Sequence, residues 1–322
     1  MRTQLPITLL ATALACTLAS TAAHARARVF VASYGNDANP CTFGSPCKTF
    51  QQAVNVVDAG GEVTAIDSAG FGPISISKAV TITSPDGVEA GIVPTAGGDA
   101  IDINAGATDA IVLRGLTLNG AGVAASNGIV FNSGAALTVT NCLVQNFPDT
   151  GGNGGFGILI RPTTGTVTFA VTNTMVANNG AIGIYYSPPS GSPDVQGVID
   201  RVVATGNGYG IAIFPVATSG GSLTATISNS IANNNTKSGI FAQSGPGPFK
   251  LTIDNMNSSS NGTGVLGTAH ANVLLSRSVV TGNGTGIDNS TSQNTFYTYG
   301  NNLIDFNTTN ITSPLNTTHA LQ

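Results

Sequence analysis

The side chains that could do acid–base or metal chemistry are few and far apart in this chain. Hydrolysis of a glycosidic bond needs two carboxyl groups flanking that bond, and calcium needs several oxygen ligands close together. No two aspartates are adjacent. Between residues 128 and 288 the aspartates are Asp149, Asp194, Asp200, Asp254 and Asp288. Their spacing favours solvated surface carboxylates over a catalytic pair.

Histidine and cysteine add little to this chemistry. Beyond residue 25 the histidines are His270 and His319, one in a loop and one in the tail, so we expect no histidine-based metal site or nucleophile. Cys142 stands beside an Asn within a repeat, where a buried, inert thiol is the ordinary interpretation. We therefore expect neither a metal nor a cofactor.

A dipeptide of Gly followed by Ile or Val recurs at intervals of 22 to 29 residues. Its glycines are Gly128, Gly157, Gly183, Gly210, Gly239, Gly264 and Gly286. A second mark lies between successive glycines: an apolar residue, then Asn or Arg two positions later, usually followed by another apolar residue. The central residues of this mark are Asn141, Asn173, Arg201, Asn229, Asn255 and Arg277. Two marks in a constant order indicate a repeat architecture.

The composition is that of a β-protein. Of 322 residues, 41 are Gly, 8% are charged and none is Trp. Thr, Val and Ile favour strands, whereas Asn and Gly favour the turns between them. A repeat of this length with two or three short strands is typical of a parallel β-helix, in which stacked coils share one core. With coils about 4.8 Å apart, roughly nine or ten of them would form a rod some 40 to 50 Å long.

The segment before the regular repeats has a different character. Phe50, Val54 and Val57 stand at helical spacing and predict a helix over 48–57, which Gly60 and Gly61 end. We expect this helix to cover the open N-terminal end of the stack, where bare strand edges would invite aggregation. Short strands are predicted at 28–32, 63–67, 74–77 and 80–83.

These residues carry a family resemblance. The apolar-x-Asn and Asn-x-x-Gly-Ile marks, with the N-terminal Pro-Cys-Lys-Thr-Phe-Gln-Gln-Ala-Val helix, resemble secreted bacterial right-handed parallel β-helix proteins, related in fold to the pectate lyases. The resemblance covers about residues 29 to 305. It implies a right-handed coil, the usual hand of parallel crossovers. The resemblance indicates a fold and not one activity, because this architecture occurs in lyases, hydrolases, epimerases, adhesins and proteins without known chemistry.

Stacked coils turn the repeats into rows of equivalent residues. If the Ile or Val after each Gly faces the core, the next residue and the one two further on face outward. These two rows bring together Tyr185, Phe214, Phe241 and Arg161, which we interpret as the candidate ligand-binding residues. Aromatic faces spaced along a rod suit stacking on sugar rings. The alternatives are that loops bury these rings or that the face contacts another copy of the chain.

The outward rows do not supply familiar catalytic residues. For a lyase, the resemblance implies clustered acidic residues that hold calcium and a basic residue that takes the proton. The only acidic residue in the two outward rows is Asp288. Asp200 and Asp254 share another row two coils apart, about 10 Å, which suits an inverting hydrolase on distance alone. Arg201 and Arg277 replace Asn in the second mark, and we interpret them as outward-turning coil corners, with binding of an anionic sugar as the alternative.

Export from the cytoplasm is expected from the start of the chain. Arg2, an apolar stretch from Leu5 to Ala22 and the small residues around Ala25 indicate a signal peptide cleaved after Ala25, hence a secreted or periplasmic protein. A disulfide between Cys41 and Cys47 suits an oxidising compartment. No later stretch is long and apolar enough for a membrane span. The net charge of −4, without a basic stripe, argues against nucleic acid.

The sequence predicts an all-β, right-handed parallel β-helix with an N-terminal capping helix. We divide it into a signal peptide (1–25), a cap with irregular first coils (26–100), the regular β-helix (101–305) and a loosely ordered tail (306–322). Its expected function is non-catalytic binding of an extracellular or envelope polysaccharide. The alternatives are a polysaccharide lyase or glycoside hydrolase with a non-standard site, and a structural surface protein without a ligand. A homo-oligomer is a further expectation left open.

Overall fold

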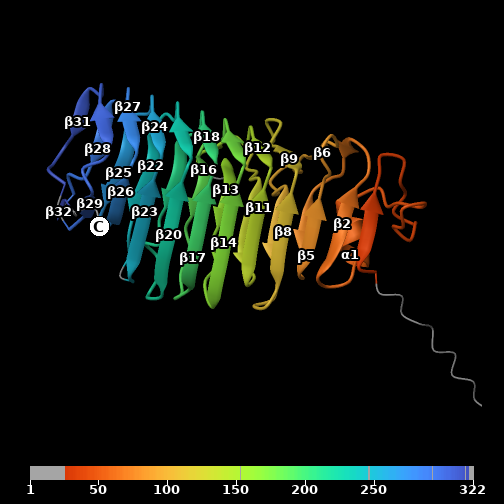
Figure 1. Ribbon diagram of the computed structural model, residues 1–322. Coiled ribbons are helices and arrows are strands. Elements are labelled where there is room, and N and C mark those ends of the chain that lie inside the picture. The colour runs from red at the N-terminus through yellow and green to blue at the C-terminus, as the bar shows by residue number, and fades with distance from the viewer. Residues whose placement is uncertain (1–25, 153, 246, 292, 316, 319–322) are drawn as a thin grey trace, which may run out of the picture.

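A computed structural model describes residues 26–152, 154–245, 247–291, 293–315 and 317–318. The predicted signal peptide and its cleavage position at Ala25 lie outside these residues. In the described part, the strands form three parallel sheets that wrap around one core (Figure 1). The first strand pairs with the second, and from the second strand onward each strand pairs with the strand three places later in the chain. This is a parallel β-helix, as the repeats predict.

We number the sheets in the order in which each coil visits them. Sheet 1 contains the strands that begin near each Gly-Ile or Gly-Val pair. Its strands are β4 (Ile74–Ile76), β7 (Ile101–Asn104), β10 (Ile129–Ser133), β13 (Phe156–Ile160), β16 (Ile182–Tyr186), β19 (Tyr209–Ile213), β22 (Ser238–Gln243), β25 (Thr263–Thr268), β28 (Thr285–Asp288) and β31 (Thr309–Ile311).

Sheet 2 contains the longest strands, with up to seven residues each. Its strands are β1 (Arg28–Val31), β2 (Gly61–Ala65), β5 (Val80–Thr83), β8 (Ala110–Arg114), β11 (Ala136–Thr140), β14 (Thr166–Thr172), β17 (Asp194–Asp200), β20 (Ser222–Ser228), β23 (Phe249–Asp254), β26 (Asn272–Ser276), β29 (Thr295–Thr298) and β32 (Thr317–Thr318).

Sheet 3 contains short strands of two to four residues. They are β3 (Ala69–Gly70), β6 (Ala90–Ile92), β9 (Leu116–Asn119), β12 (Leu143–Gln145), β15 (Met175–Ala177), β18 (Val203–Thr205), β21 (Ile231–Asn233), β24 (Asn257–Ser259), β27 (Val279–Thr281) and β30 (Leu303–Asp305).

The corner between sheets 2 and 3 explains the second sequence mark. Its central residues all adopt left-handed backbone conformations, with φ between 47° and 54°. Asn tolerates this region better than most residues because its short polar side chain can hydrogen-bond locally. Arg201 and Arg277 occupy the same corner and are exposed, which confirms their interpretation as outward-turning corners.

A buried ladder of asparagine side chains lies at the corner between sheets 3 and 1. Each Nδ2 donates to the Oδ1 of the equivalent Asn in the next coil: Asn179 to Asn207 (3.0 Å), Asn207 to Asn235 (3.1 Å), Asn235 to Asn261 (2.9 Å) and Asn261 to Asn283 (3.1 Å). The same oxygens also accept from backbone N–H groups one coil back. The ladder therefore satisfies backbone groups where the chain turns inside the core.

The N-terminal end of the stack carries the helix α1 (Phe50–Val56), which contacts β1, β2 and β4 (Figure 1). Thr49 caps it by accepting a hydrogen bond from the Gln52 N–H at 3.2 Å. Phe50, with Ala53 and Val54, is buried, and its ring lies 4.9 Å from that of Phe71. The predicted helix is confirmed in its place, but it is shorter than the expected 48–57.

The disulfide predicted between Cys41 and Cys47 is present, and both residues are buried. At the opposite end, strand pairing continues beyond residue 305. There β31 pairs with β28 and β32 pairs with β29, so the stack extends into the segment expected to be loosely ordered.

Candidate functional site

Three of the four candidate residues lie on the outward face of sheet 1, and their aromatic rings form one continuous row of contacts. Tyr185 and Phe241 share a row two coils apart, separated by Ala212, whose small side chain is fully covered. Phe214 lies beside them, with its ring 6.3 Å from Tyr185 and 5.6 Å from Phe241. All three rings are partly exposed. The loops that follow these strands therefore do not bury them completely.

Two further rings, Phe156 and Tyr209, extend this surface. Phe156 lies 5.2 Å from the Tyr185 ring and Tyr209 lies 5.4 Å from the Phe241 ring, and both are partly exposed. We call the set the aromatic platform; it consists of Phe156, Tyr185, Tyr209, Phe214 and Phe241. The platform crosses four consecutive coils, from β13 to β22.

Strict alternation places Phe156 and Tyr209 in the core, which is why the sequence rows miss them. The glycine of each Gly-Ile pair breaks the alternation. A Cβ on Gly157 would lie 2.9 Å from the ladder amide of Asn179 and 2.6 Å from the Gly183 carbonyl oxygen. The Gly position thus faces the interior together with the following Ile, so the residue before the glycine faces outward. An aromatic residue directly before Gly-Ile was the signal available in the sequence.

A cation lies at one edge of the platform. The Lys237 Nζ sits 4.9 Å from the centre of the Tyr209 ring, within the range of a cation–π interaction. Since Lys237 is exposed, this contact contributes modestly to stability, but it places a positive charge beside the rings.

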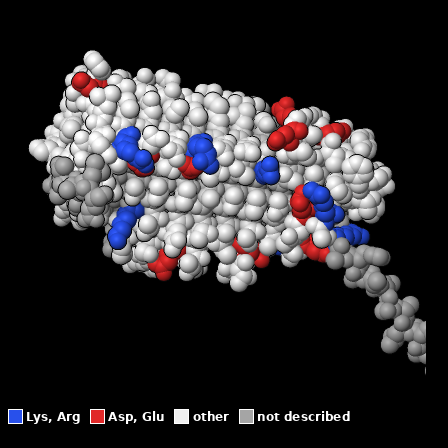
Figure 2. Space-filling view, in the orientation of Figure 1, with Lys and Arg blue, Asp and Glu red and all other residues white. Residues whose placement is uncertain are grey.

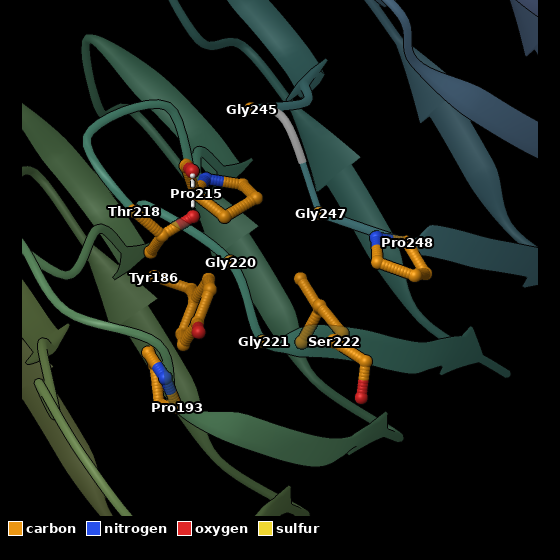
Figure 3. A pocket seen from close by; sticks show the side chains of 11 residues that line it. Tyr186, Pro193, Pro215, Thr218, Gly220, Gly221, Ser222, Gly245, Gly247 and Pro248 are labelled. Atoms are coloured by element: carbon orange, nitrogen blue, oxygen red, sulfur yellow. Dashed lines mark hydrogen bonds between the residues drawn. The ribbon is translucent and has the colours of Figure 1, made fainter.

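Pro- and Gly-rich loops follow these strands. They stack on one another at the corner between sheets 1 and 2, through backbone bonds from Ser219 N–H to Gly191 and from Ser222 N–H to Pro193. They enclose a cavity of about 10 Å³ in which Tyr186 faces Pro193, Pro215 and Pro248 (Figure 3). Tyr186 belongs to the core, stacked on Phe169, and the platform rings do not line this cavity.

Arg161, the fourth candidate, lies in a polar network toward the N-terminal side of the platform. Its Nε donates to Asn132 Oδ1 at 2.6 Å. Asn132 Nδ2 in turn donates to Asp102 Oδ1 at 2.7 Å, and Asn104 Nδ2 donates to Asp102 Oδ2 at 2.6 Å. Both carboxylate oxygens of Asp102 are thereby held by amides.

This network reaches the platform through a second aspartate. Asn127 Nδ2 donates to Asp99 Oδ1 at 2.8 Å, and Asn127 Oδ1 accepts from the backbone N–H of Phe156 at 3.1 Å. Burial raises the pKa of Asp99 and the neighbouring Asp102 charge adds to this, although the Asn127 hydrogen bond opposes it. We call this region the polar patch; it consists of Asp99, Asp102, Asn104, Asn127, Asn132 and Arg161.

The aspartate pair considered for hydrolysis does not suit that role. Hydrogen bonds from Asn229 and Ser228, with the nearby Arg201 charge, hold the pKa of Asp200 below its ordinary value. The Arg277 hydrogen bond likewise lowers the pKa of Asp254. A general acid needs a raised pKa, so neither carboxyl group is prepared to donate a proton. Figure 2 shows such basic and acidic side chains lying side by side on a mostly uncharged face.

The remaining candidates are isolated in the structure. Burial raises the pKa of Asp288, but hydrogen bonds from Ser290 and Thr312 outweigh it and leave the pKa below its ordinary value. Cys142 is buried and its pKa is raised to about 11, which makes it an inert thiol. Among the described residues, no group of three or more His, Cys, Asp or Glu side chains could hold a metal ion. No helix in that part of the chain is long and apolar enough to span a membrane.

No protein-family model matches the chain, and no curated protein matches it in sequence. Among solved structures, it is similar to pectate lyase Pel9A, with a TM-score of 0.48, 16% identity and coverage of 86% of this chain and 72% of that one. It is also similar to a rhamnogalacturonan lyase, with a TM-score of 0.45, 12% identity and coverage of 78% and 81%. A third is the GH136 lacto-N-biosidase from Eubacterium ramulus, with a TM-score of 0.45, 14% identity and coverage of 91% and 68%.

The chain is a parallel β-helix protein. This assignment rests on its own strand pairing, in which each described strand of the three sheets lies parallel to the equivalent strand of the next coil. The outward face of sheet 1 combines the aromatic platform with the polar patch at its N-terminal side.

Proposed function

We propose that this protein is exported from the cytoplasm and binds a polysaccharide on the aromatic platform. The observation that carries the proposal is the unbroken contact of five partly exposed rings across four coils. Sugar rings present apolar C–H faces that pack on aromatic side chains, and a sizeable exposed apolar patch usually marks a contact surface. The disulfide between Cys41 and Cys47 supports an oxidising location.

The test compares retention on immobilised polysaccharides of the wild type and of the variant Tyr185→Ala/Phe241→Ala. We expect the variant to lose most of its retention, because both substitutions remove rings from one row of the platform. The matched control is Tyr34→Ala/Phe306→Ala, which removes two rings that are 69% and 82% exposed elsewhere on the molecule. Equal retention of the wild type and the platform variant would reject the proposal.

Self-association through the same rings is the alternative that this experiment must separate. If the platform were an oligomer contact, the Tyr185→Ala/Phe241→Ala variant would change the sedimentation coefficient of the protein without any polysaccharide present. A structural role without a ligand would leave both retention and sedimentation unchanged.

A hydrolase is the second candidate, and one observation favours it. Asp99 has a raised pKa and lies near Asp102, whose two oxygens are held by amides, directly beside the platform. Such a pair could supply a protonated acid and a charged base. New reducing ends in the retained polysaccharide, lost in Asp99→Asn, would establish the activity, whereas unsaturated products absorbing in the ultraviolet would indicate a lyase.

A further inference from the structure

The charges around the platform restrict what can lie on it. Asp99 and Asp102 occupy the N-terminal side of the face. Asp288 stands in the same row as Tyr185 and Phe241, two coils beyond Phe241, because Phe241 pairs with Leu266 and Leu266 pairs with Asp288. The row therefore carries a carboxylate on each side of its rings.

The two cations of this face are already engaged. Arg161 donates to Asn132, and its charge acts on Asp99, where it favours the ionised form. Lys237 lies over the Tyr209 ring. The three carboxylates and two cations named here sum to a formal charge of −1, and the whole chain has a formal charge of −4.

A polyuronate carries one carboxylate on every sugar and needs cations, or bridging metal ions, to offset that charge. An extended glycan along the rod would bring these carboxylates toward Asp99, Asp102 and Asp288. Among the described residues, no group of three or more His, Cys, Asp or Glu side chains is placed to hold a bridging calcium ion. Repulsion between like charges would therefore oppose binding.

A neutral glycan meets no such obstacle. Its hydroxyl groups can donate to carboxylate and amide oxygens and accept from amide and guanidinium N–H groups, and the polar patch presents all of these next to the rings. Resting on the function proposed above, we propose that the platform and the polar patch together bind an uncharged polysaccharide and reject polyuronates.

The experiment uses pairs of polymers that share a backbone and differ in the charge of their substituents. Methyl-esterified homogalacturonan and the same polymer after saponification form one pair, and hydroxyethyl cellulose and carboxymethyl cellulose form a second pair of the same cellulose backbone. At low ionic strength we expect the wild type to bind the uncharged member at least about tenfold more tightly, with the difference shrinking at about 1 M salt. If the protein binds a pair of polymers and its affinity for the acidic member equals or exceeds that for the uncharged member, the inference is overturned.

Removing one carboxylate charge tests whether this face causes the preference for the uncharged polymer. Asp102→Asn is expected to narrow the preference for the uncharged polymer severalfold, and Asp288→Asn is a second variant should the first lower the melting temperature. The matched control is Asp200→Asn, at the corner between sheets 2 and 3, which should leave the preference unchanged. If the preference is identical in Asp102→Asn, Asp288→Asn and the wild type, the proposed cause is wrong.

Failure of the underlying function gives a different pattern. In that case the Tyr185→Ala/Phe241→Ala variant binds every polymer as the wild type does, whatever its charge. Failure of the present inference alone leaves platform-dependent binding intact and changes only which member of each pair is preferred.

Discussion

Asn207 shows how much one side chain contributes in this fold. Its Nδ2 donates to Asn235 Oδ1 and to the Val176 carbonyl, and its Oδ1 accepts from the backbone N–H and Nδ2 of Asn179. The residue is buried, so water cannot replace these partners. Polar groups left unsatisfied in a protein interior destabilise it by about 1–3 kcal/mol each.

Asn207→Ala is therefore expected to lower the free energy of unfolding by about 3 kcal/mol or more, measured by chemical denaturation. Asn257→Ala, on the exposed side of β24, serves as the control and should change it by less than about 0.5 kcal/mol. Similar values for the two variants would show that the ladder does not stabilise the coil stack.

The pH dependence of stability should distinguish Asp99 from Asp200. The pKa of Asp99 is raised in the folded state, so the unfolded state loses its proton first as pH rises and stability falls above about pH 4. Asp99→Asn should then increase the melting temperature at pH 7 relative to the wild type and have little effect at pH 3.

For Asp200, the expected change of stability with pH has the opposite sign. Its pKa is lowered in the folded state, so its contribution is present above about pH 4 and is lost as pH falls through the folded pKa. Asp200→Asn should lower the melting temperature slightly at pH 7 and not at low pH. A decrease at pH 7 for Asp99→Asn would contradict our description of its surroundings.

Alternation along a strand could predict Tyr185, Phe214 and Phe241 as one surface but not their neighbours. Alternation did not predict Phe156 and Tyr209 at the surface, because an inward-facing glycine follows each of them. Whether such a glycine faces inward depends on the asparagine ladder in the adjacent coil. Asp99 and Asp102 precede Gly128, the first Gly-Ile pair, so no row from the repeats includes them. Contacts between coils, rather than local pattern, determine these positions.

At the scale of the strand and its corners, glycine sets the distance between coils. A Cβ on Gly183 would lie 2.6 Å from the Gly210 carbonyl oxygen and 3.0 Å from the ladder amide of Asn207. The Asn207 amide is held by hydrogen bonds to Val176 and Asn235, and the Gly210 oxygen belongs to the backbone, so neither can move away easily.

Gly183→Ala should therefore lower the free energy of unfolding by about 1–3 kcal/mol, the usual cost of overpacking an interior. Gly44→Ala is the control, because a Cβ there meets no atom within 4 Å. Thermal unfolding of both variants provides the measurement, and an unchanged midpoint for Gly183→Ala would mean that the coils can separate to accommodate the methyl group.

The corners also explain why the repeats predicted the fold so well. Each of the coils that begin with β14, β17, β20, β23 and β26 has a left-handed residue between sheets 2 and 3, a buried Asn between sheets 3 and 1, and a glycine after it. These features recur from coil to coil and leave marks in the sequence. The extension of the stack to β31 and β32 lacks a Gly-Ile mark, so it was not evident from the pattern.

At the scale of the whole molecule, each coil is stabilised by its contacts with the neighbouring coils. The N-terminal coil has a neighbour on one side only, so it needs an additional stabilising interaction. The disulfide closes a loop between Cys41 and Cys47, six residues apart, beside β1. Loop-closure entropy for so short a loop predicts a contribution of about 2 kcal/mol.

Reduction should thus lower the unfolding free energy by about that amount, measured by denaturation with and without a reductant. The variant Cys41→Ser/Cys47→Ser should match the reduced wild type and not respond to the reductant. A wild type that is equally stable in both conditions would show that this bond does not restrain the N-terminal end.

The rod also determines how a ligand would lie. The platform rings follow the stacking direction across four coils, so a polysaccharide chain running along the rod can contact several rings at once. Affinity should therefore increase with the number of sugars until the ligand spans the platform.

The most direct test is isothermal titration of the wild type and Tyr185→Ala/Phe241→Ala with oligosaccharides of increasing length, prepared from a polysaccharide that the wild type retains. We predict that wild-type affinity increases with length and then levels off, and that the variant binds the longest ligand at least about tenfold more weakly with an unchanged melting temperature. The same affinity in both proteins at every length would contradict glycan binding on the aromatic platform.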